Sequence, residues 1–374
     1  MKLALICRPF SFHGGIETAT AGLVNALVKR GGHDLHLLTT AAQFPAAGIT
    51  IHRLPVLSQP SVLRHLSFAL AARRAARAGG FDLVQSHERA LEQDIYRAGE
   101  GSHRAYLGAM GRSRVQVNPQ HRLLLHLERR IFTLRSARHI VAISARGKAE
   151  IEALYGTPSA SISVVYNGVD LARFHPDNRQ RWRDDMRTSL GIPAEAWLIA
   201  FVGSGFERKG LGPLLDAVAH LGDRRVRVLV AGKGRTEAYR ERAARLGVAG
   251  VVTWIAPRPD VERVYATADV VALPARYEPF GNVHLEALAS GVPVLTSAAT
   301  GGAEVVGDGV SGAVVATPTL EEIARGLREI RDGDAGRLGV AAREAAEPFT
   351  YAAQVEGLEE IYRRLGGERV AGDE

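Results

Sequence analysis

Two glutamates stand eight positions apart in the stretch ARYEPFGNVHLEALASGVPVLTS. Glu278 comes just before an aromatic–glycine pair, whereas Glu286 lies where apolar residues recur with helical spacing. This spacing predicts a helix that begins near Asn282 and ends at Gly291. Ionised carboxylates accept hydrogen bonds from hydroxyl groups, so the pair suits a ligand that carries several hydroxyls.

The residues before the predicted helix suit a phosphate group. Backbone N–H groups in the first turn of a helix lack partners within the helix and lie at the positive end of its dipole. We therefore expect the helix start to hold a diphosphate, with Glu278 contacting the group on the outer phosphate and Glu286 contacting a ribose. The backbone expected to contact this donor belongs to Phe280, Gly281, Asn282 and Val283.

The elements that position these residues alternate along the whole chain. Short apolar runs rich in β-branched residues are followed by helical stretches, which predicts an α/β protein with parallel sheets. A length of 374 residues exceeds one hydrophobic core, so we expect two doubly wound, Rossmann-like domains. They are predicted at 1–168 and 169–350, and a final helix at 351–374 is expected to cross back to the first domain. Ligands bind beyond the carboxyl ends of such strands, so the site is expected in a cleft between the domains.

Composition and charge narrow the class of protein. With 46% hydrophobic and 23% charged residues, and without an apolar run of about 18 residues, the chain is expected to be soluble and cytoplasmic. Cys7, the only cysteine, is expected to be a packed strand residue. Residues 103–148 carry ten Lys and Arg against the single acid Glu128, and this basic segment predicts an anionic partner.

Several longer motifs identify a family. In order along the chain they are GGIET, NGVDLARFHP, FVGSGFERKG, VAGKG and YATADVVALPARYEPFGNVHLEALASGVPVLTSAATGGAEVV. Together they resemble the retaining glycosyltransferases of the GT-B type, family four, whose signature is E-x7-E. The resemblance covers nearly the whole chain. It implies the GT-B fold, a nucleotide-sugar donor and transfer with retention of the anomeric configuration.

One departure from the family pattern points to a branch. Gly203 is followed by Ser204, where the common pattern has an arginine, and Arg208 stands next to Lys209. This form, together with DIYRAGEGSHRAYL, resembles the bacterial lipopolysaccharide-core glucosyltransferases. The two cations would stabilise the charge of the leaving nucleotide.

The resemblance and the residue types together define the candidate site. The glycines of GGIET let the backbone approach the donor closely, and Glu100 and His103 are expected on the acceptor side. The catalytic candidates are Glu278, Arg208, Lys209, His103 and Glu100. The donor-binding candidates are Gly14, Gly15, Gly203, Arg258, Phe280, Gly281, Asn282, Val283 and Glu286.

The resemblance implies transfer of a hexose, glucose, from UDP-glucose to the inner core of lipopolysaccharide or a similar lipid-linked saccharide. No cofactor and no metal are expected, and the protein is expected at the cytoplasmic face of the bacterial inner membrane. The leaving diphosphate would accept the proton of the acceptor hydroxyl. A nucleotide-sugar epimerase of the same architecture and a transferase with a soluble acceptor remain alternatives.

Other classes of protein fit less well. A nicotinamide-dependent oxidoreductase needs G-x-G-x-x-G and an acidic residue after the next strand, and FVGSGFERKG and VRVLVAGKG lack them. A metal-dependent transferase needs an Asp-x-Asp pair at a strand end, but Asp332 and Asp334 follow a predicted helix and are expected at the surface. A nucleic-acid binder needs aromatic residues within the basic segment, which holds only Tyr106 and Phe132.

The basic segment also contains an amphipathic pattern. Leu124, Leu127, Ile131 and Leu134 are spaced for one helix face, with arginines around them. Such a helix can lie on an anionic membrane surface, and we expect residues 103–148 to do so. One alternative is that the apolar stripe packs on the sheet of its own domain and the arginines are solvated. Another is that the stripe is buried and only the preceding segment RAYLGAMGRSRVQ touches lipid.

Overall fold

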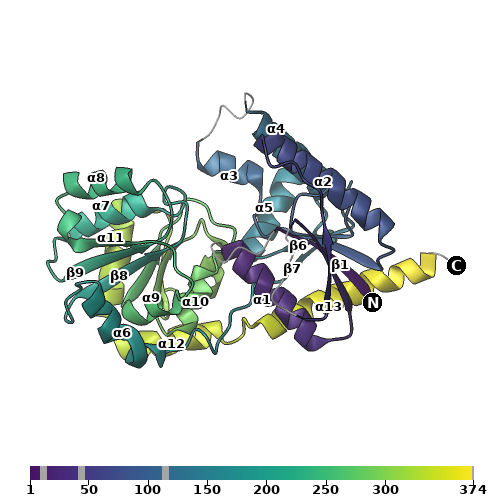
Figure 1. The fold of residues 1–374 in the computed structure, drawn as a ribbon. Helices are drawn as coiled ribbons and strands as arrows, with labels where there is room; N and C mark the ends of the chain where they lie inside the picture. Colours follow the sequence, from purple (N-terminus) through teal and green to yellow (C-terminus); the bar gives the residue numbers. More distant parts are fainter. Residues whose placement is uncertain (9–14, 41–46, 112–117, 373–374) are drawn as a thin grey trace. The chain divides into compact units, whose positions relative to one another are not determined.

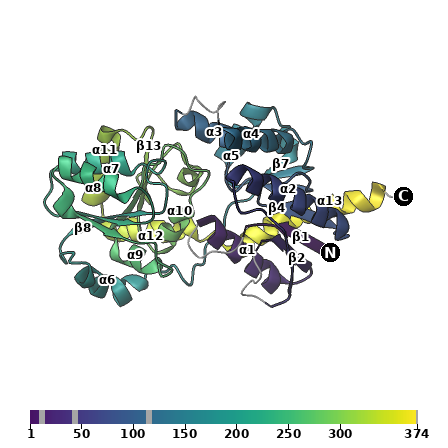
Figure 2. The same ribbon diagram turned by 45° about the horizontal axis from the view of Figure 1, so that its top comes forward.

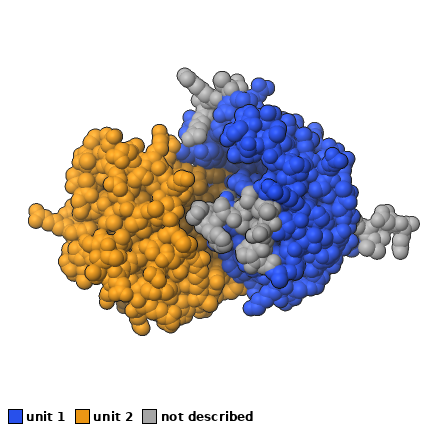
Figure 3. Space-filling view, in the orientation of Figure 1, with its two compact units in different colours: residues 1–12, 16–168, 351–374 blue, residues 13–15, 169–350 orange. Residues whose placement is uncertain are grey.

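The computed structural model describes residues 1–8, 15–40, 47–111 and 118–372, and it divides into two compact units (Figures 1 and 3). Most of the chain up to Gly168 forms the first unit together with the last helix, α13 (Tyr351–Gly372). The second unit contains Val169–Thr350. Each unit has its own parallel sheet with helices, so the predicted α/β class with two Rossmann-like domains is confirmed.

The sheet of the first unit has the order β3-β2-β1-β4-β5-β6-β7 among the described residues. The order reverses at β1, which pairs with β2 on one side and β4 on the other. Open α/β sheets bind ligands beyond the carboxyl ends of the two strands at such a reversal. The strands are β1 (Lys2–Ile6), β2 (Asp34–Thr39), β3 (Ile49–Arg53), β4 (Leu83–Ser86), β5 (Ile95–Arg97), β6 (His139–Ala142) and β7 (Ile162–Val164). The helices are α1 (Gly15–Arg30), α2 (Ser61–Ala78), α3 (His103–Ala109), α4 (Pro119–Phe132) and α5 (Ala145–Tyr155).

The sheet of the second unit has the order β10-β9-β8-β11-β12-β13, with its reversal between β8 and β11. Its strands are β8 (Trp197–Val202), β9 (Val226–Ala231), β10 (Val252–Ile255), β11 (Val270–Leu273), β12 (Val294–Ser297) and β13 (Gly312–Val315). Its helices are α6 (Asn178–Ser189), α7 (Leu211–Leu221), α8 (Thr236–Arg245), α9 (Glu262–Thr267), α10 (Val283–Ala289), α11 (Leu320–Asp332) and α12 (Ala335–Ala346), with a 3₁₀ turn η4 (Gly301–Val305).

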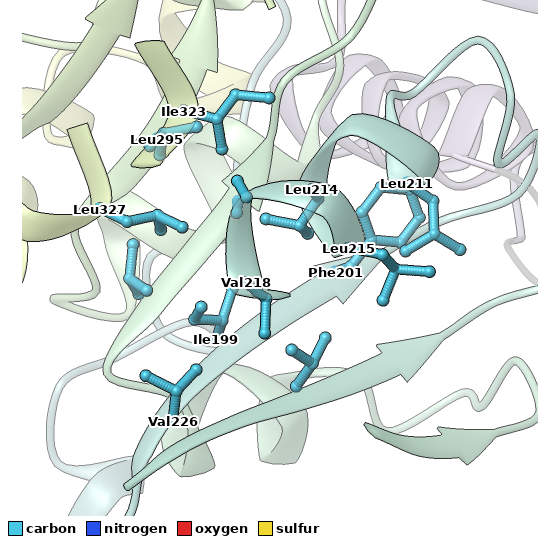
Figure 4. Packing of buried hydrophobic residues seen from close by; sticks show 14 of the residues in the cluster. Ile199, Phe201, Leu211, Leu214, Leu215, Val218, Val226, Leu295, Ile323 and Leu327 are labelled. Carbon is cyan, nitrogen blue, oxygen red and sulfur yellow. The ribbon is translucent and has the colours of Figure 1, made fainter. Parts of the chain in front are cut away.

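The core of the second unit holds β8 and α7 together. Ile199 and Phe201 alternate along β8, so they point to one face, where they pack with Leu214 and Val218 of α7 (Figure 4). Helices α7, α8 and α11 cover this face, and α6, α9 and α12 cover the other (Figures 1 and 2). All four of these side chains are at most 4% exposed, so the strand ends that carry the site rest on a packed layer.

Helix α13 belongs to the core of the first unit. Its apolar face packs with the first strand and the first helix in one buried cluster. The members from α13 are Val355, Leu358, Ile361, Tyr362 and Leu365, and those from β1 are Leu3 and Leu5. The end of the chain therefore stabilises the strand at its beginning.

The predicted amphipathic helix is present as α4, but its apolar stripe faces inward. Leu127 and Ile131 are buried in the first unit, and Leu124 is half-buried. Leu134 lies beyond the helix end with a φ of 57°. The stripe packs inside its own domain, so the expectation that this stripe contacts lipid is wrong.

Candidate active site

Two loops of the second unit bring three of the predicted catalytic residues together. Strands β8 and β11 are neighbours, so the loops at their carboxyl ends meet at the reversal of the sheet. The loop after β8 carries Arg208 and Lys209, and the loop after β11 carries Glu278. Oε2 of Glu278 lies 2.7 Å from Nη1 of Arg208 and 3.0 Å from Nζ of Lys209.

Burial makes this ion cluster electrostatically strong. Glu278 is 8% exposed and Lys209 is 7% exposed. Burial by itself raises the pKa of Glu278, but Lys209 and Arg208 outweigh that effect and lower the pKa to about 2. The carboxylate is therefore ionised at neutral pH. Two cations against one carboxylate leave a net positive charge, which favours an anionic ligand.

Two predicted glycines position these charged side chains. Gly203 has a φ of +122°, and a Cβ there would lie 3.0 Å from Cε of Lys209. The side chain of Lys209 therefore packs directly against the backbone of Gly203. Gly281 has a φ of +83°, and a Cβ there would lie 3.0 Å from Cγ of Glu278. Both positions require glycine because of backbone conformation and the close side chains. Their contact with a donor remains a prediction.

His284 fixes the loop that carries Glu278. Its Nδ1 lies 2.7 Å from the carbonyl oxygen of Gly281, and its Nε2 lies 2.7 Å from Oγ1 of Thr296 on β12. A carbonyl oxygen can only accept a hydrogen bond, so Nδ1 of His284 carries the proton. Nε2 then accepts a hydrogen bond from the hydroxyl of Thr296. Burial lowers the pKa of His284 to about 4, which keeps the ring neutral. The N–H of Gly301 also donates to the carbonyl of Glu278 at 2.9 Å. Sequence reasoning missed His284, although it stands between the two glutamates.

Glu286 lies on α10, which is the helix predicted from the apolar spacing. The hydroxyl of Tyr265, a fully buried side chain on α9, donates to Oε2 of Glu286 at 2.6 Å. Burial raises the pKa of Glu286, and the hydrogen bond from Tyr265 opposes this rise. Tyr265 was missed because nothing in the local sequence around residue 265 marks it as a partner of α10.

The start of α10 differs in part from the prediction. The N–H of His284 donates to the carbonyl of Gly281 at 3.0 Å, so this first-turn amide already has a partner. The side chain of Phe280 is buried, which leaves only its backbone for contact with a ligand. Asn282 and Val283 are half-buried. Their contact with a diphosphate stays a prediction.

Arg258 follows β10, and a neighbouring acid holds its guanidinium. Its Nε and Nη2 each lie 2.6 Å from an oxygen of Asp260, which makes a bidentate pair. Within the described residues this pair is separate from the ion cluster around Glu278. A donor contact would require Arg258 to leave or share Asp260.

The predicted acceptor-side residues lie in the first unit. Glu100 follows β5, and its two oxygens bind Arg8 and Arg89. Burial raises the pKa of Glu100, but Arg89 and Arg8 outweigh it and lower the pKa to about 2. Glu100 is thus an ion-paired carboxylate, which makes it a weak proton acceptor. An acceptor contact through Glu100 stays a prediction.

His103 is the first residue of α3. Its Nε2 lies 3.0 Å from Nδ1 of His121, and its backbone N–H donates to the buried carboxylate of Glu128. Burial and the nearby Arg89 lower the pKa of His103 to about 4, so its ring is neutral at pH 7. A neutral imidazole can accept a proton, and its catalytic role stays a prediction.

Sequence reasoning missed two charged residues at the reversal of the first sheet. Arg8 follows β1 and Glu88 follows β4, and Nε of Arg8 lies 2.8 Å from Oε1 of Glu88. Burial raises the pKa of Glu88 to about 8 even beside Arg8. Polar residues directly after a buried strand were the available signal. Of the two glycines in GGIET, Gly14 lies outside the described residues and Gly15 is the first residue of α1.

The remaining expectations concern metal and membrane. Asp332 ends α11 and Asp334 caps α12, and both are exposed, as predicted. Among the described residues, no group of three or more His, Cys, Asp or Glu is placed to hold a metal ion. No helix in the described ranges is long and apolar enough to span a bilayer.

Models of two known protein families match the two parts of the chain. Residues 183–347 match the model of glycosyl transferases group 1, and residues 13–173 match that of glycosyltransferase family 4. The chain belongs to the GT-B glycosyltransferases. Among solved structures, its fold is similar to WaaG, a glycosyltransferase involved in lipopolysaccharide biosynthesis, with a TM-score of 0.83. That likeness covers 96% of this chain and 99% of WaaG at 23% identity. Anabaena Alr3699/HepE, solved with UDP and glucose, has a TM-score of 0.75 at 19% identity over 97% of this chain and 100% of that one.

The relatives of this chain found by sequence differ from its structural neighbours. A D-inositol 3-phosphate glycosyltransferase of Corynebacterium aurimucosum is 35% identical over 60% of this chain and 56% of that protein. An uncharacterized glycosyltransferase, MJ1607 of Methanocaldococcus jannaschii, is 27% identical over 88% of this chain and 89% of that one. The chain spans about half the length of the inositol-phosphate relatives it matches.

Proposed function

We propose that this protein transfers a hexose from a nucleoside-diphosphate sugar to a hydroxyl acceptor with retention of the anomeric configuration. The observation that carries the proposal is the cluster of Glu278, Arg208 and Lys209 at the reversal of the second sheet. It combines a net positive charge for a diphosphate with a buried carboxylate for sugar hydroxyls.

Each residue then has a defined task. Arg208 and Lys209 bind the diphosphate and stabilise its charge as the bond from the anomeric carbon to the phosphate oxygen breaks. Glu278 accepts hydrogen bonds from the sugar, and Glu286, oriented by Tyr265, accepts those of the ribose. The acceptor oxygen forms the new bond to the anomeric carbon, and its proton passes to the departing diphosphate. This sequence of steps needs no metal and no cofactor.

UDP-glucose is the donor we propose, because the fold neighbour HepE was solved with UDP and glucose. The acceptor we propose is a lipid-linked saccharide such as the inner core of lipopolysaccharide, in line with the likeness to WaaG. The protein would then work at the cytoplasmic face of the bacterial inner membrane. The inositol-phosphate relatives favour a second candidate, a small phosphorylated polyol.

A donor and acceptor panel tests the proposal. The protein is incubated with UDP-glucose, UDP-galactose and GDP-mannose, each alone, with truncated lipopolysaccharide and with inositol phosphate. Release of nucleoside diphosphate that depends on one acceptor supports transfer, and nuclear magnetic resonance of the product gives its anomeric configuration. Interconversion of donor sugars without acceptor would indicate an epimerase, and an inverted product would refute retention.

A further inference from the structure

Helix α2 exposes a row of leucines. Six large apolar side chains are strongly exposed among the described residues, and four of them belong to α2 or the segment just before it. On α2 they are Leu63 (42% exposed), Leu66 (37%) and Leu70 (49%), and Leu57 (55%) precedes the helix. Isolated exposed leucines are common, but a cluster of this kind marks an interaction surface.

The leucines point away from the core of their own unit. Successive helix residues lie about 100° apart, so Leu63, Leu66 and Leu70 fall within an arc of about 60°. The fully buried Ala72 lies about 150° from the middle of this arc, and the fully buried Ala69 lies about 90° from it. Amphipathic helices of globular proteins normally bury their large apolar residues. Helix α2 instead buries alanines and exposes leucines.

The charge around this row is positive. Helix α2 contains four arginines and no acid. Arg73 and Arg77 pair with Glu92, whereas Arg64 and Arg74 are exposed. The adjacent helix α4, joined to α2 by the hydrogen bond from Ser61 to Gln120, adds further exposed arginines. They are Arg122 and Arg129, and the single acid of α4, Glu128, is buried.

We propose that the exposed leucine face of α2, defined as Leu63, Leu66, Leu70 and Arg74 and flanked by the exposed Arg64, docks on an anionic lipid surface. Leucines on one helix face with arginines beside them are typical of helices that lie in a membrane interface. A symmetric dimer through this face would bring the arginines of two copies together without an acid to pair them, which is unfavourable. The role of this docking rests on the proposed function: it would bring the protein to a lipid-linked acceptor.

Flotation with vesicles tests the docking without any sugar transfer. The wild type is expected to float with vesicles that contain phosphatidylglycerol, to stay behind with phosphatidylcholine alone, and to dissociate as salt rises. The triple variant Leu63→Ser, Leu66→Ser, Leu70→Ser should bind at least about tenfold less, and so should Arg64→Gln with Arg74→Gln. Matched controls in the second unit are Val310→Ser with Val340→Ser, and Arg224→Gln with Arg337→Gln, whose side chains are also exposed. Both controls should bind like the wild type.

A site-specific probe tests whether the leucine row itself enters the interface. Cys7 is the only cysteine and is 1% exposed, so an introduced cysteine can be labelled selectively. An environment-sensitive fluorophore on Leu66→Cys should shift to the blue with anionic vesicles, and the same fluorophore on Val340→Cys should not. Equal shifts at both positions would overturn the proposal.

Further outcomes decide whether a lipid surface or a second copy of the chain binds the leucine face of α2. A triple leucine variant that floats like the wild type would refute the docking surface. A wild type that is dimeric in solution and becomes monomeric in this variant would assign the face to a second copy of the chain. Donor hydrolysis in the absence of vesicles should be unchanged in the leucine variants. Flotation as expected together with inactivity toward every nucleotide-sugar would refute the proposed function and leave the docking intact.

Discussion

The variant Glu278→Gln separates two roles of the ion cluster. It keeps the shape of the side chain and removes the charge that lies 2.7 Å from Arg208 and 3.0 Å from Lys209. In the free protein this carboxylate neutralises one of the two cations. It also opposes the approach of a phosphate to both of them.

The magnitude follows from the pKa of Glu278. Its fall from 4.5 to about 2, at about 1.4 kcal/mol for each pH unit, corresponds to about 3 kcal/mol of net attraction for the ionised form. Glu278→Gln removes this attraction, so Arg208 and Lys209 are both available to bind the diphosphate. We expect UDP to bind about tenfold more tightly, because part of that energy becomes available to the phosphates. Transfer should nevertheless fall more than tenfold, because the sugar loses a charged hydrogen-bond acceptor.

Calorimetry with UDP and UMP, together with initial rates of transfer, measures both effects. UMP lacks the outer phosphate, so its affinity should change less than that of UDP. The control is Asp216→Asn, which breaks the ion pair with Arg242 elsewhere in the second unit and should leave UDP binding and transfer unchanged. Weaker UDP binding in Glu278→Gln, or transfer close to the wild-type rate, would refute the reasoning.

Three further variants test the surrounding residues. Lys209→Ala should lower the transfer rate at least about a hundredfold, and wild-type activity should survive excess EDTA; restoration by magnesium after chelation would reveal a metal requirement. Tyr265→Phe should raise the pKa of Glu286 further by removing its hydrogen bond, so UDP affinity should weaken severalfold and its loss at low pH should begin at a higher pH. His284→Asn should reduce the pH dependence of stability. The pKa of His284 is lowered from 6.5 to about 4, so the unfolded chain binds more protons between these values and wild-type stability falls, by up to about 3 kcal/mol, as pH drops from about 6.5 to 4. Thermal unfolding at pH 7 and pH 5 should show a smaller difference in the variant, and an equal difference would contradict the assigned role.

Local patterns were sufficient to predict much of the fold. The alternation of apolar runs and helical stretches predicted two parallel α/β domains. Strands and helices repeat their apolar residues about every two and about every 3.6 positions, and these repeats can be seen in residues close together in the sequence. For the same reason the apolar spacing predicted α10, which bears Glu286, and the position of Asp332 and Asp334 after a helix predicted their exposure.

The partners of the site residues depended on the tertiary structure. Glu278 and Arg208 are seventy positions apart and meet because β8 and β11 pair, and strand order is not a local property of the chain. Glu100 was expected on the acceptor side, but its partners could not be predicted: Arg8 and Arg89 converge on it from neighbouring strand ends and hold it ionised.

Helices α2 and α4 show most clearly which features cannot be predicted from local sequence. The sequence by itself determined that α4 would be an amphipathic helix among arginines. Only the tertiary structure decided that Leu127 of α4 is buried while Leu63 and Leu70 of α2 are exposed. Helical periodicity specifies which side chains share a face, but the face that meets the core is set by where the sheet lies. That position results from contacts between residues far apart in the chain.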